Sequence, residues 1–318
     1  MNAPDDLAAG ILPFSRIVGQ DSLKLALELA FVAPAINGVL VSGERGTAKS
    51  TLVRAFSLMA HGQLPVTLPI NATDDRVLGG WDIDALMDSR AVKRAGLIEE
   101  AGRAGMLYID EVNLLDDHIV NILLDVAAAG ILLVEREGQE TRTPVSFVLL
   151  GTMNPEEGWL RPQLLDRFGL MAAVDSLEPD QRHRMVMTVL RFDEERASER
   201  AGERSAWLEE ARALDRERAE ALRKARSALN SVHLPEDLAR RTVDAVTALG
   251  ALGHRGEVAA LKAAMAHAAL DGAHEVTGRH IRKVLPMALS HRRADDDQTG
   301  VRLWSEEDEV VLADLFEE

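Results

Sequence analysis

The chain has 318 residues, of which 47% are hydrophobic and 28% are charged, and its formal net charge is −16 at pH 7. This composition predicts a folded protein of one large domain or two, and not a disordered chain. The acidic balance argues against binding to nucleic acid or to an anionic membrane, because a protein that neutralises phosphates needs a basic surface. The absence of cysteine excludes disulfides and thiolate metal sites.

Residues 1–13 are predicted to form a flexible lead-in. They lack the basic and then apolar pattern of a signal peptide, and no stretch approaches the ~20 apolar residues of a membrane span. We therefore expect a cytoplasmic protein that makes no membrane contact. The nine histidines show no close pairing of the H-E-x-x-H kind, so we interpret them as surface or capping residues and not as metal ligands.

A glycine-rich loop follows a helix predicted over 23–32 and a short apolar strand over 38–42, and it precedes helical spacing over 52–59. Such a loop directs backbone N–H groups and the positive end of a helix dipole into one concavity, which favours a polyphosphate. Lys49 would reach the β- and γ-phosphates, and the Ser50 hydroxyl would bind Mg²⁺. The nine residues of the loop motif are Gly43, Glu44, Arg45, Gly46, Thr47, Ala48, Lys49, Ser50 and Thr51.

The loop departs from the strict pattern, because Ala48 stands where Gly usually precedes the lysine. A second nucleotide motif is therefore needed to support it. The buried-looking strand 106–110 provides one, since it ends in two adjacent carboxylates, Asp110 and Glu111. The first would hold the Mg²⁺ shell, and the second would orient or deprotonate an attacking water.

Further apolar strands are interleaved with helices, which predicts an α/β fold with a parallel sheet covered on both faces. Ligands bind at the carboxyl ends of such strands, where Gly43, Asp110 and Asn154 all fall. The turn-rich stretch 71–84 remains open between a surface loop and a functional insertion. The other elements expected in this half are a strand at 66–70, helices at 97–104 and 119–129, a hairpin from 131–134 and 141–143, and strands at 145–150 and 170–174.

The remainder of the chain is predicted to be helical as far as residue 291. The segment 194–226 is dense in Glu and Arg at i,i+4 spacing, which is typical of a solvated helix with weak ion pairs. Amphipathic helices over 238–249, 257–270 and 277–289 must pack on one another. An acidic tail follows, in which residues 310–316 would form one short amphipathic helix.

With these motifs in order, the chain resembles the AAA+ ATPases and, among them, the ATPase (I) subunit of magnesium chelatase. The resemblance runs from residue 17 to about residue 293. It is carried by the stretches IVGQDSLKLAL, GERGTAKST, LYIDEVNLLDDHIVNILLDVAAAG, NPEEGWLRPQLLDRFGL and GHRGEV.

The resemblance implies hydrolysis of ATP with Mg²⁺ in a homo-oligomeric ring, usually a hexamer. By match of motif, Ile17 and Val18 would line the adenine pocket, as part of 17–20. Asn154 would be the sensor 1 residue, Arg167 the arginine finger that reaches a neighbour's ATP, and Arg255 the sensor 2 residue on the helical lid. An ion pair with Asp166 or a nearby acid remains the alternative for Arg167, and a lid surface residue the alternative for Arg255.

The resemblance also implies a domain organisation. An AAA+ P-loop NTPase core would span 14–178, with a helix-2 insertion at 71–95 and a pre-sensor-1 hairpin at 131–144. An all-helical lid would span 179–293, and the acidic tail at 294–318 lies outside the similarity.

The partners that the resemblance implies are a subunit with an integrin-type (VWA) domain and a larger subunit that handles the metal and the tetrapyrrole. The same clade contains MoxR-like chaperones that act on VWA-type partners, and motors that remodel DNA. The net charge makes nucleic acid the less expected substrate. A scaffold that binds ATP with little turnover is a further alternative, which Glu111 argues against because a pure binder needs no positioned base.

Overall fold

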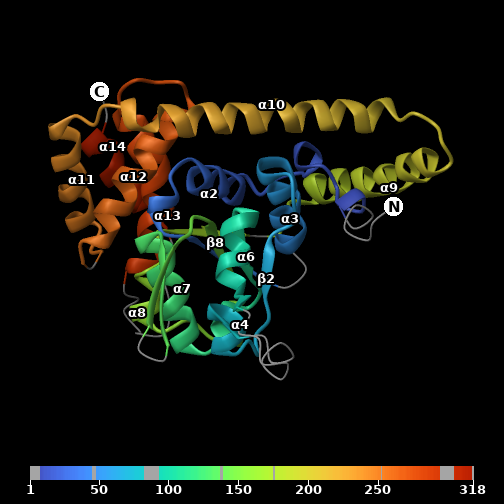
Figure 1. Cartoon of the computed structure of the whole chain (residues 1–318). Coiled ribbons are helices and arrows are strands. Elements are labelled where there is room, and N and C mark those ends of the chain that lie inside the picture. Colours follow the sequence, from blue (N-terminus) through green and yellow to red (C-terminus); the bar gives the residue numbers. More distant parts are fainter. Residues whose placement is uncertain are drawn as a thin grey trace.

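A five-stranded parallel sheet, with helices on both faces, forms the N-terminal part of the computed structural model, and a helical region follows it (Figure 1). The structure describes residues 8–44, 48–81, 93–136, 139–174, 176–251, 253–293 and 304–316. Its elements, with 3₁₀ helices written η, are η1 (Phe14–Arg16), α2 (Asp21–Val32), η2 (Pro34–Ile36), β1 (Val39–Ser42), α3 (Lys49–His61), β2 (Val66–Leu68), α4 (Asp74–Leu78), β3 (Gly79–Trp81), β4 (Lys93–Ala95), α6 (Leu97–Ala104), β5 (Met106–Ile109), η3 (Val112–Leu114), α7 (Asp117–Ala129), β6 (Ile131–Arg136), β7 (Gln139–Pro144), β8 (Val148–Met153), η4 (Pro155–Glu157), α8 (Pro162–Leu165), β9 (Leu170–Ala173), α9 (Pro179–Arg200), α10 (Ala206–Ala228), η5 (Leu229–Ser231), α11 (Glu236–Ala248), α12 (Arg255–Leu270), α13 (Gly278–Leu289), η6 (Ser290–Arg292) and α14 (Glu306–Phe316).

The sheet has the strand order β2-β5-β8-β1-β9 with every pair parallel, which confirms the predicted parallel sheet. Strand β8 begins at Val148, three residues later than expected, so that it ends directly before Asn154. The hairpin expected within 131–144 is confirmed, since β6 and β7 pair antiparallel from Ile131 opposite Pro144. A second small hairpin, β3 with β4, flanks the part of the 71–95 insertion that lies outside the described residues.

Successive residues of each strand point to opposite faces of the sheet, and both faces are buried. In β1, Val39 and Val41 join the core on the side of α2 and α3, whereas Leu40 joins the core on the side of α6 and α7. In β5, Tyr108 faces the α3 side and Leu107 the α6 side. This alternation decides which side chains of β5 can meet the helix that begins at the glycine-rich loop.

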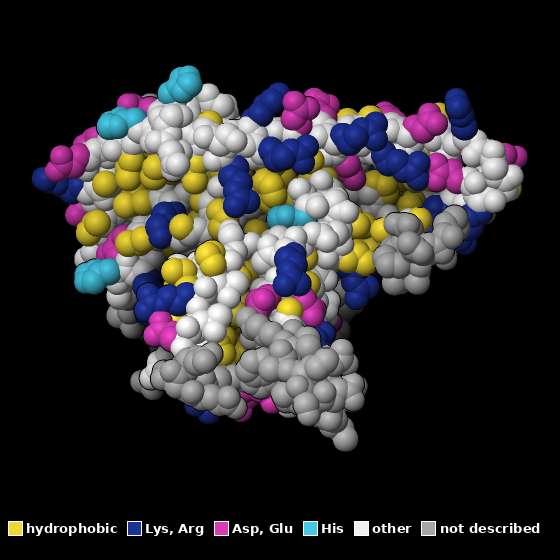
Figure 2. Space-filling view, in the orientation of Figure 1, with side chains coloured by type: hydrophobic (Ala, Val, Ile, Leu, Met, Phe, Trp, Pro, Cys, Tyr) yellow, Lys and Arg dark blue, Asp and Glu magenta, His cyan; other side chains and the backbone are white. Residues whose placement is uncertain are grey.

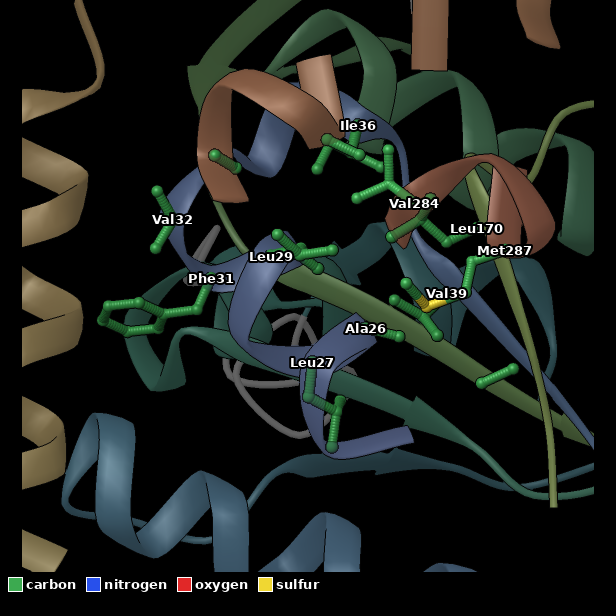
Figure 3. Close-up of a cluster of buried hydrophobic side chains, with 14 of the residues drawn as sticks. Ala26, Leu27, Leu29, Phe31, Val32, Ile36, Val39, Leu170, Val284 and Met287 are labelled. Atoms are coloured by element: carbon green, nitrogen blue, oxygen red, sulfur yellow. The ribbon is translucent and has the colours of Figure 1, made fainter. Parts of the chain in front are cut away.

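The helical region shares a core with the sheet. Figure 3 shows Leu29 of α2, Val39 of β1 and Leu170 of β9 close to Val284 and Met287 of α13. All five side chains are at most 5% exposed. The lid therefore packs directly on the edge of the sheet that ends in β9.

The segment 194–226 differs from the single solvated helix expected for it. It is divided between α9 and α10. Helix α10 packs along η1, α2 and α3, and buries Leu208, Leu222 and three alanines there. Arg218 of α10 makes a bidentate ion pair with the buried carboxylate of Glu28 in α2. The outer face does carry interspersed acids and bases, as predicted (Figure 2).

Both ends of the described chain are more firmly packed than the sequence indicates. Leu12, within the expected lead-in, is only 5% exposed and belongs to the core beside α3 and α10. In the acidic tail, α14 packs on α11 and α13. Within the described ranges, no helix is both long and apolar enough to span a membrane.

A buried ion pair holds α14 to the lid. Both terminal guanidinium nitrogens of Arg293 donate to the Asp308 carboxylate at 2.7 Å, and the two side chains are 2% and 5% exposed. Burial raises the pKa of Asp308, but hydrogen bonds from Arg293 and Ser305 outweigh it and leave that pKa below its ordinary value. The stabilisation from this pair is therefore complete above the unfolded pKa of about 4, and it is lost as the pH falls through the lower folded pKa.

We expect Asp308→Asn to lower the free energy of unfolding by about 3–5 kcal/mol, because it leaves the Arg293 guanidinium buried without a countercharge. Urea unfolding at neutral pH measures this loss. Asp237→Asn is the matched control, since the Asp237–Arg241 pair on α11 is exposed and worth only about 0.3–0.5 kcal/mol. Equal losses in the two variants would show that Arg293–Asp308 contributes no more than a surface pair.

Candidate functional site

Three neighbouring strands bring most of the predicted site residues to one edge of the sheet. Strand β5 ends directly before Asp110 and Glu111, β8 directly before Asn154, and β1 directly before Gly43. These strands lie side by side in that order. The Gly43 N–H donates to the carbonyl of Met153 at 3.2 Å, so the loop begins directly beside Asn154. Asn154 is buried, and its side chain accepts the N–H of Glu156 at the start of η4.

The glycine-rich loop leaves β1 at a crowded position. A Cβ at Gly43 would collide with the carbonyl oxygen of Val174, so only glycine fits there. The Lys49 ammonium donates to the carbonyl oxygens of Gly43 (2.5 Å) and Glu44 (2.7 Å). Burial lowers the pKa of Lys49, while the nearby carboxylates, Asp110 first, oppose that shift. Arg45, Gly46 and Thr47 lie outside the described residues.

Ala48 occupies a backbone conformation that explains why glycine is the usual residue there. Its φ is 59° and its ψ 20°, in the left-handed region, at the N-cap of α3. This conformation costs an L-residue with a Cβ about 1–2 kcal/mol. The methyl group is thus tolerated at a local cost, and Lys49, Ser50 and Thr51 still form the first turn of α3.

The two predicted metal ligands are joined by a hydroxyl that the sequence analysis did not single out. Tyr108 Oη lies 2.9 Å from Ser50 Oγ and donates to Asp110 Oδ1 at 2.8 Å. Thr152 of β8 donates to the same carboxylate oxygen at 2.7 Å. Burial, as the main cause, raises the pKa of Tyr108 to about 12. Hydroxyl and carboxylate oxygens are the hard donors that Mg²⁺ prefers, so this set fits the cation.

Glu111 follows Asp110 with a left-handed backbone, φ 56° and ψ 57°. Its N–H donates to Thr152 Oγ1 at 3.1 Å. The same threonine hydroxyl therefore contacts both carboxylate residues of the motif. A non-glycine residue held at positive φ is strained, and such strain concentrates at functional positions.

The predicted adenine-pocket residues lie along the same edge. Ile17 is 5% exposed, and its carbonyl accepts a hydrogen bond from Lys24 Nζ at 2.6 Å, whereas Val18 is half-buried. The turn continues through Gly19, where a Cβ would lie 2.7 Å from Leu177. Since Leu177 follows β9, this turn approaches the segment that also borders the glycine-rich loop.

Arg167 lies at the opposite edge of the sheet. The Asn37 side chain, just before β1, donates to the Arg167 carbonyl at 2.8 Å, and the Gly169 N–H donates to the Asn37 carbonyl. Asn37 is at the amino end of β1 and Gly43 at its carboxyl end, so the full strand separates Arg167 from its own glycine-rich loop. The Arg167 guanidinium instead contacts Asn121 and Asp125 of α7.

Arg255 lies beside Arg167 and not beside the glycine-rich loop. It begins α12, and its guanidinium pairs with Asp166 at 2.5 Å while its side chain is 61% exposed. Burial, and then the charge of Arg255, lower the pKa of Arg167. Asp166 also accepts from buried Arg292 at 3.2 Å, which fixes it between two elements of the lid.

Sequence reasoning missed Tyr108, Thr152 and Arg292, and it considered Asp166 only as a partner of Arg167, whereas Asp166 pairs with Arg255 and Arg292. Tyr108 carried a usable signal, since it stands two residues before Asp110 and side chains at i and i+2 of a strand share a face. Thr152 had the weaker signal of a polar residue near the end of an apolar strand. Arg292 carried none, because its partners Asp166 and Phe168 lie more than 120 residues away in the sequence.

Comparisons with known proteins agree with this geometry. The model of the AAA domain (dynein-related subfamily) matches residues 38–168, and the model of the AAA lid domain matches residues 239–312. The magnesium-chelatase 38 kDa subunit of Cereibacter sphaeroides is 42% identical over 91% of this chain and 94% of its own length.

Two solved structures are also similar. A chain of the complex between the BchI and BchD subunits of magnesium chelatase is 39% identical, with coverage of 95% of this chain and 99% of that one and a TM-score of 0.48. A putative ATPase from Cytophaga hutchinsonii has a TM-score of 0.63 at 16% identity, and the match covers 97% of this chain and 91% of that one. At this identity the similarity supports only the fold. The chain therefore belongs to the family of magnesium-chelatase ATPase subunits, and it is an AAA+ ATPase with a helical lid.

Proposed function

We propose that this chain is the ATP-driven motor of a magnesium-chelatase-like complex, which hydrolyses ATP at interfaces between its own copies and thereby remodels a partner subunit. One observation carries the proposal. The residues predicted to bind phosphate and Mg²⁺ lie at the carboxyl edge of the sheet, whereas Arg167 and Arg255 lie together at its amino edge. A single copy would therefore hold two half-sites, which a head-to-tail contact between copies would bring together.

At the carboxyl edge, Lys49 would contact the β- and γ-phosphates, and Ser50 and Asp110 would hold Mg²⁺. Bound Mg²⁺ would neutralise charge that develops on the phosphate oxygens. Glu111 would orient the attacking water and take its proton, and Asn154 would hold that water or contact the γ-phosphate. Ile17 and Val18 would pack against the base.

At the amino edge, Arg167 and Arg255 would serve the adjacent subunit. Both are guanidinium groups, which stay ionised and match the planar charge of a transferring phosphoryl group. Their partners Asp125 and Asp166 are 67% and 31% exposed, so exchange of these ion pairs for phosphate costs little. The ring is proposed to be a hexamer, as in the family.

The partner is proposed by analogy with relatives. The solved BchI–BchD complex contains a second subunit type, and the chain here is 39% identical to one of that complex's chains. A VWA-type subunit and a tetrapyrrole-handling subunit remain predictions, as does a cytoplasmic location. A MoxR-like chaperone would differ only in the partner on which it acts.

Reconstitution tests this assignment. We expect insertion of Mg²⁺ into protoporphyrin only when the chain, ATP, a BchD-type subunit and a porphyrin-binding subunit are all present, and no insertion when Lys49→Ala replaces the native chain. Insertion by the chain alone would contradict the division of labour. ATP turnover that DNA stimulates, with a steep salt dependence, would favour the DNA-remodelling alternative.

A further inference from the structure

We propose that the hydroxyl of Tyr108 is a positioning group that orients both Mg²⁺ ligands, Ser50 and Asp110. The inference rests on the magnesium site of the proposed function. Tyr108 is the single tyrosine of the chain, and it is 1% exposed. Its ring packs in the core on the α3 side of the sheet, and its hydroxyl meets Ser50 at the first turn of α3.

The direction of each hydrogen bond follows from the protons available. An ionised carboxylate accepts only, so Tyr108 must donate its one proton to Asp110 Oδ1 at 2.8 Å. The 2.9 Å bond between Ser50 Oγ and Tyr108 Oη must then be donated by Ser50. The three groups thus form a chain with one polarity, from Ser50 through Tyr108 to Asp110.

This polarity prepares the Ser50 hydroxyl for a cation. A serine hydroxyl has one proton and two lone pairs, and the proton rotates to suit its surroundings. Because Tyr108 accepts that proton, the lone pairs of Ser50 are directed away from the tyrosine and are available to a metal. A phenylalanine ring would fill the same space and leave the hydroxyl of Ser50 free to rotate.

Hydrogen bonds also orient the carboxylate of Asp110. Tyr108 and Thr152 both donate to Oδ1, at 2.8 and 2.7 Å. Within the part of the chain that the structure describes, no hydrogen bond to Oδ2 is seen, so this oxygen is available to the cation or to a water bound to it. Partners in this position typically change metal affinity or activity by about 10–100-fold when they are removed.

The test is Tyr108→Phe, with binding of a fluorescent ADP analogue titrated against Mg²⁺. We expect the Mg²⁺ concentration for half-maximal effect to rise about 10–100-fold, while the affinity in EDTA stays unchanged and kcat at saturating Mg²⁺ stays within a few-fold of the native value. Thr67→Val is the matched control, since it removes an exposed hydroxyl from the residue that pairs with Tyr108 in β2. In a Ser50→Ala background, Tyr108→Phe should have a smaller effect than in the native chain.

The single tyrosine also gives a readout without substitution. Incorporation of 3-fluorotyrosine yields one ¹⁹F resonance, which should shift when Mg²⁺ is added to the ADP complex and should not shift when EDTA is added in its place. Equal loss of ADP affinity with and without Mg²⁺ in Tyr108→Phe, or a resonance that Mg²⁺ does not move, would overturn the proposal. A native chain whose ADP binding ignores Mg²⁺ would instead overturn the metal site, and the inference with it.

Discussion

Glu111→Gln is expected to bind ATP as tightly as the native chain and to hydrolyse it about 10²–10⁴ times more slowly. Glu111 would act on the attacking water, whose proton transfer occurs only in the transition state, so its loss leaves the ground-state complex intact. The backbone N–H of Glu111 donates to Thr152, a contact that the substitution keeps. Glutamine also has nearly the same volume, so the strained left-handed conformation at φ 56° is not perturbed further.

Lys49→Ala should fail at an earlier step, the binding of the nucleotide. The Lys49 ammonium donates hydrogen bonds to the carbonyl oxygens of Gly43 and Glu44, at the start of the loop that would bind the phosphates. Its charge would meet phosphate already in the ground state, so its removal should abolish most nucleotide binding. The two variants therefore separate binding from chemistry at a single site.

Equilibrium titration with a fluorescent ATP analogue, run alongside measurement of phosphate release, gives both quantities. Glu156→Gln is the matched control, because Glu156 is an exposed acid on the neighbouring strand end, two residues after Asn154. It should leave binding and turnover near their native values. If Glu111→Gln loses affinity as strongly as Lys49→Ala, Glu111 is part of the binding site and not the base.

Much of the ATPase core could be predicted because its signals are local. Continuous apolar strands identified the parallel sheet, and the chain direction at Gly43, Asp110 and Asn154 placed all three at the same edge. The residues that orient these groups were less visible. Thr152 of β8 contacts Asp110 at the end of the adjacent strand β5, and that contact depends on the β5–β8 register, which no local pattern determines.

The lid was harder to predict for the same reason. Its helices were recognised from their periodicity, but the placement of Arg255 depends on contacts between distant segments. Asp166 holds Arg255 on one side and Arg292 on the other, and these residues come from three different parts of the chain. The packing of α10 across α2 and α3 was not predicted, because the many charged residues of the segment 194–226 indicated a fully solvated helix (Figure 2).

Arg167→Ala is expected to lower ATP hydrolysis by about 10³–10⁵-fold while nucleotide binding is retained. The length of β1 separates Arg167 from its own glycine-rich loop, so its guanidinium would act on a neighbour's nucleotide. The contact with Asp125 does not oppose this role, since Asp125 is 67% exposed and such pairs are worth about 0–1 kcal/mol. Phosphate would compete readily for the guanidinium.

If Arg167 acts in trans, two inactive variants should restore activity when they are mixed, which a structural ion pair does not predict. Arg167→Ala chains keep the loop lysine, and Lys49→Ala chains keep the arginine, so a mixed interface between the two can be complete. In a random 1:1 mixture, about a quarter of the interfaces have an intact lysine facing an intact arginine, because each condition is met half the time. Hydrolysis should therefore recover to as much as about a quarter of the native rate if the interfaces work independently.

The measurement is phosphate release by each variant alone and by the mixture, with assembly of mixed rings followed by subunit exchange between two fluorescent labels. Arg103→Ala, which replaces a 70% exposed arginine on α6, controls for the loss of positive charge and should stay near native activity. Arg255→Ala should be rescued by Lys49→Ala in the same way, because Arg255 lies at the same edge as Arg167. If mixed rings form and their activity is no higher than that of the separate variants, Arg167 does not act in trans, and its contact with Asp125 is a structural ion pair.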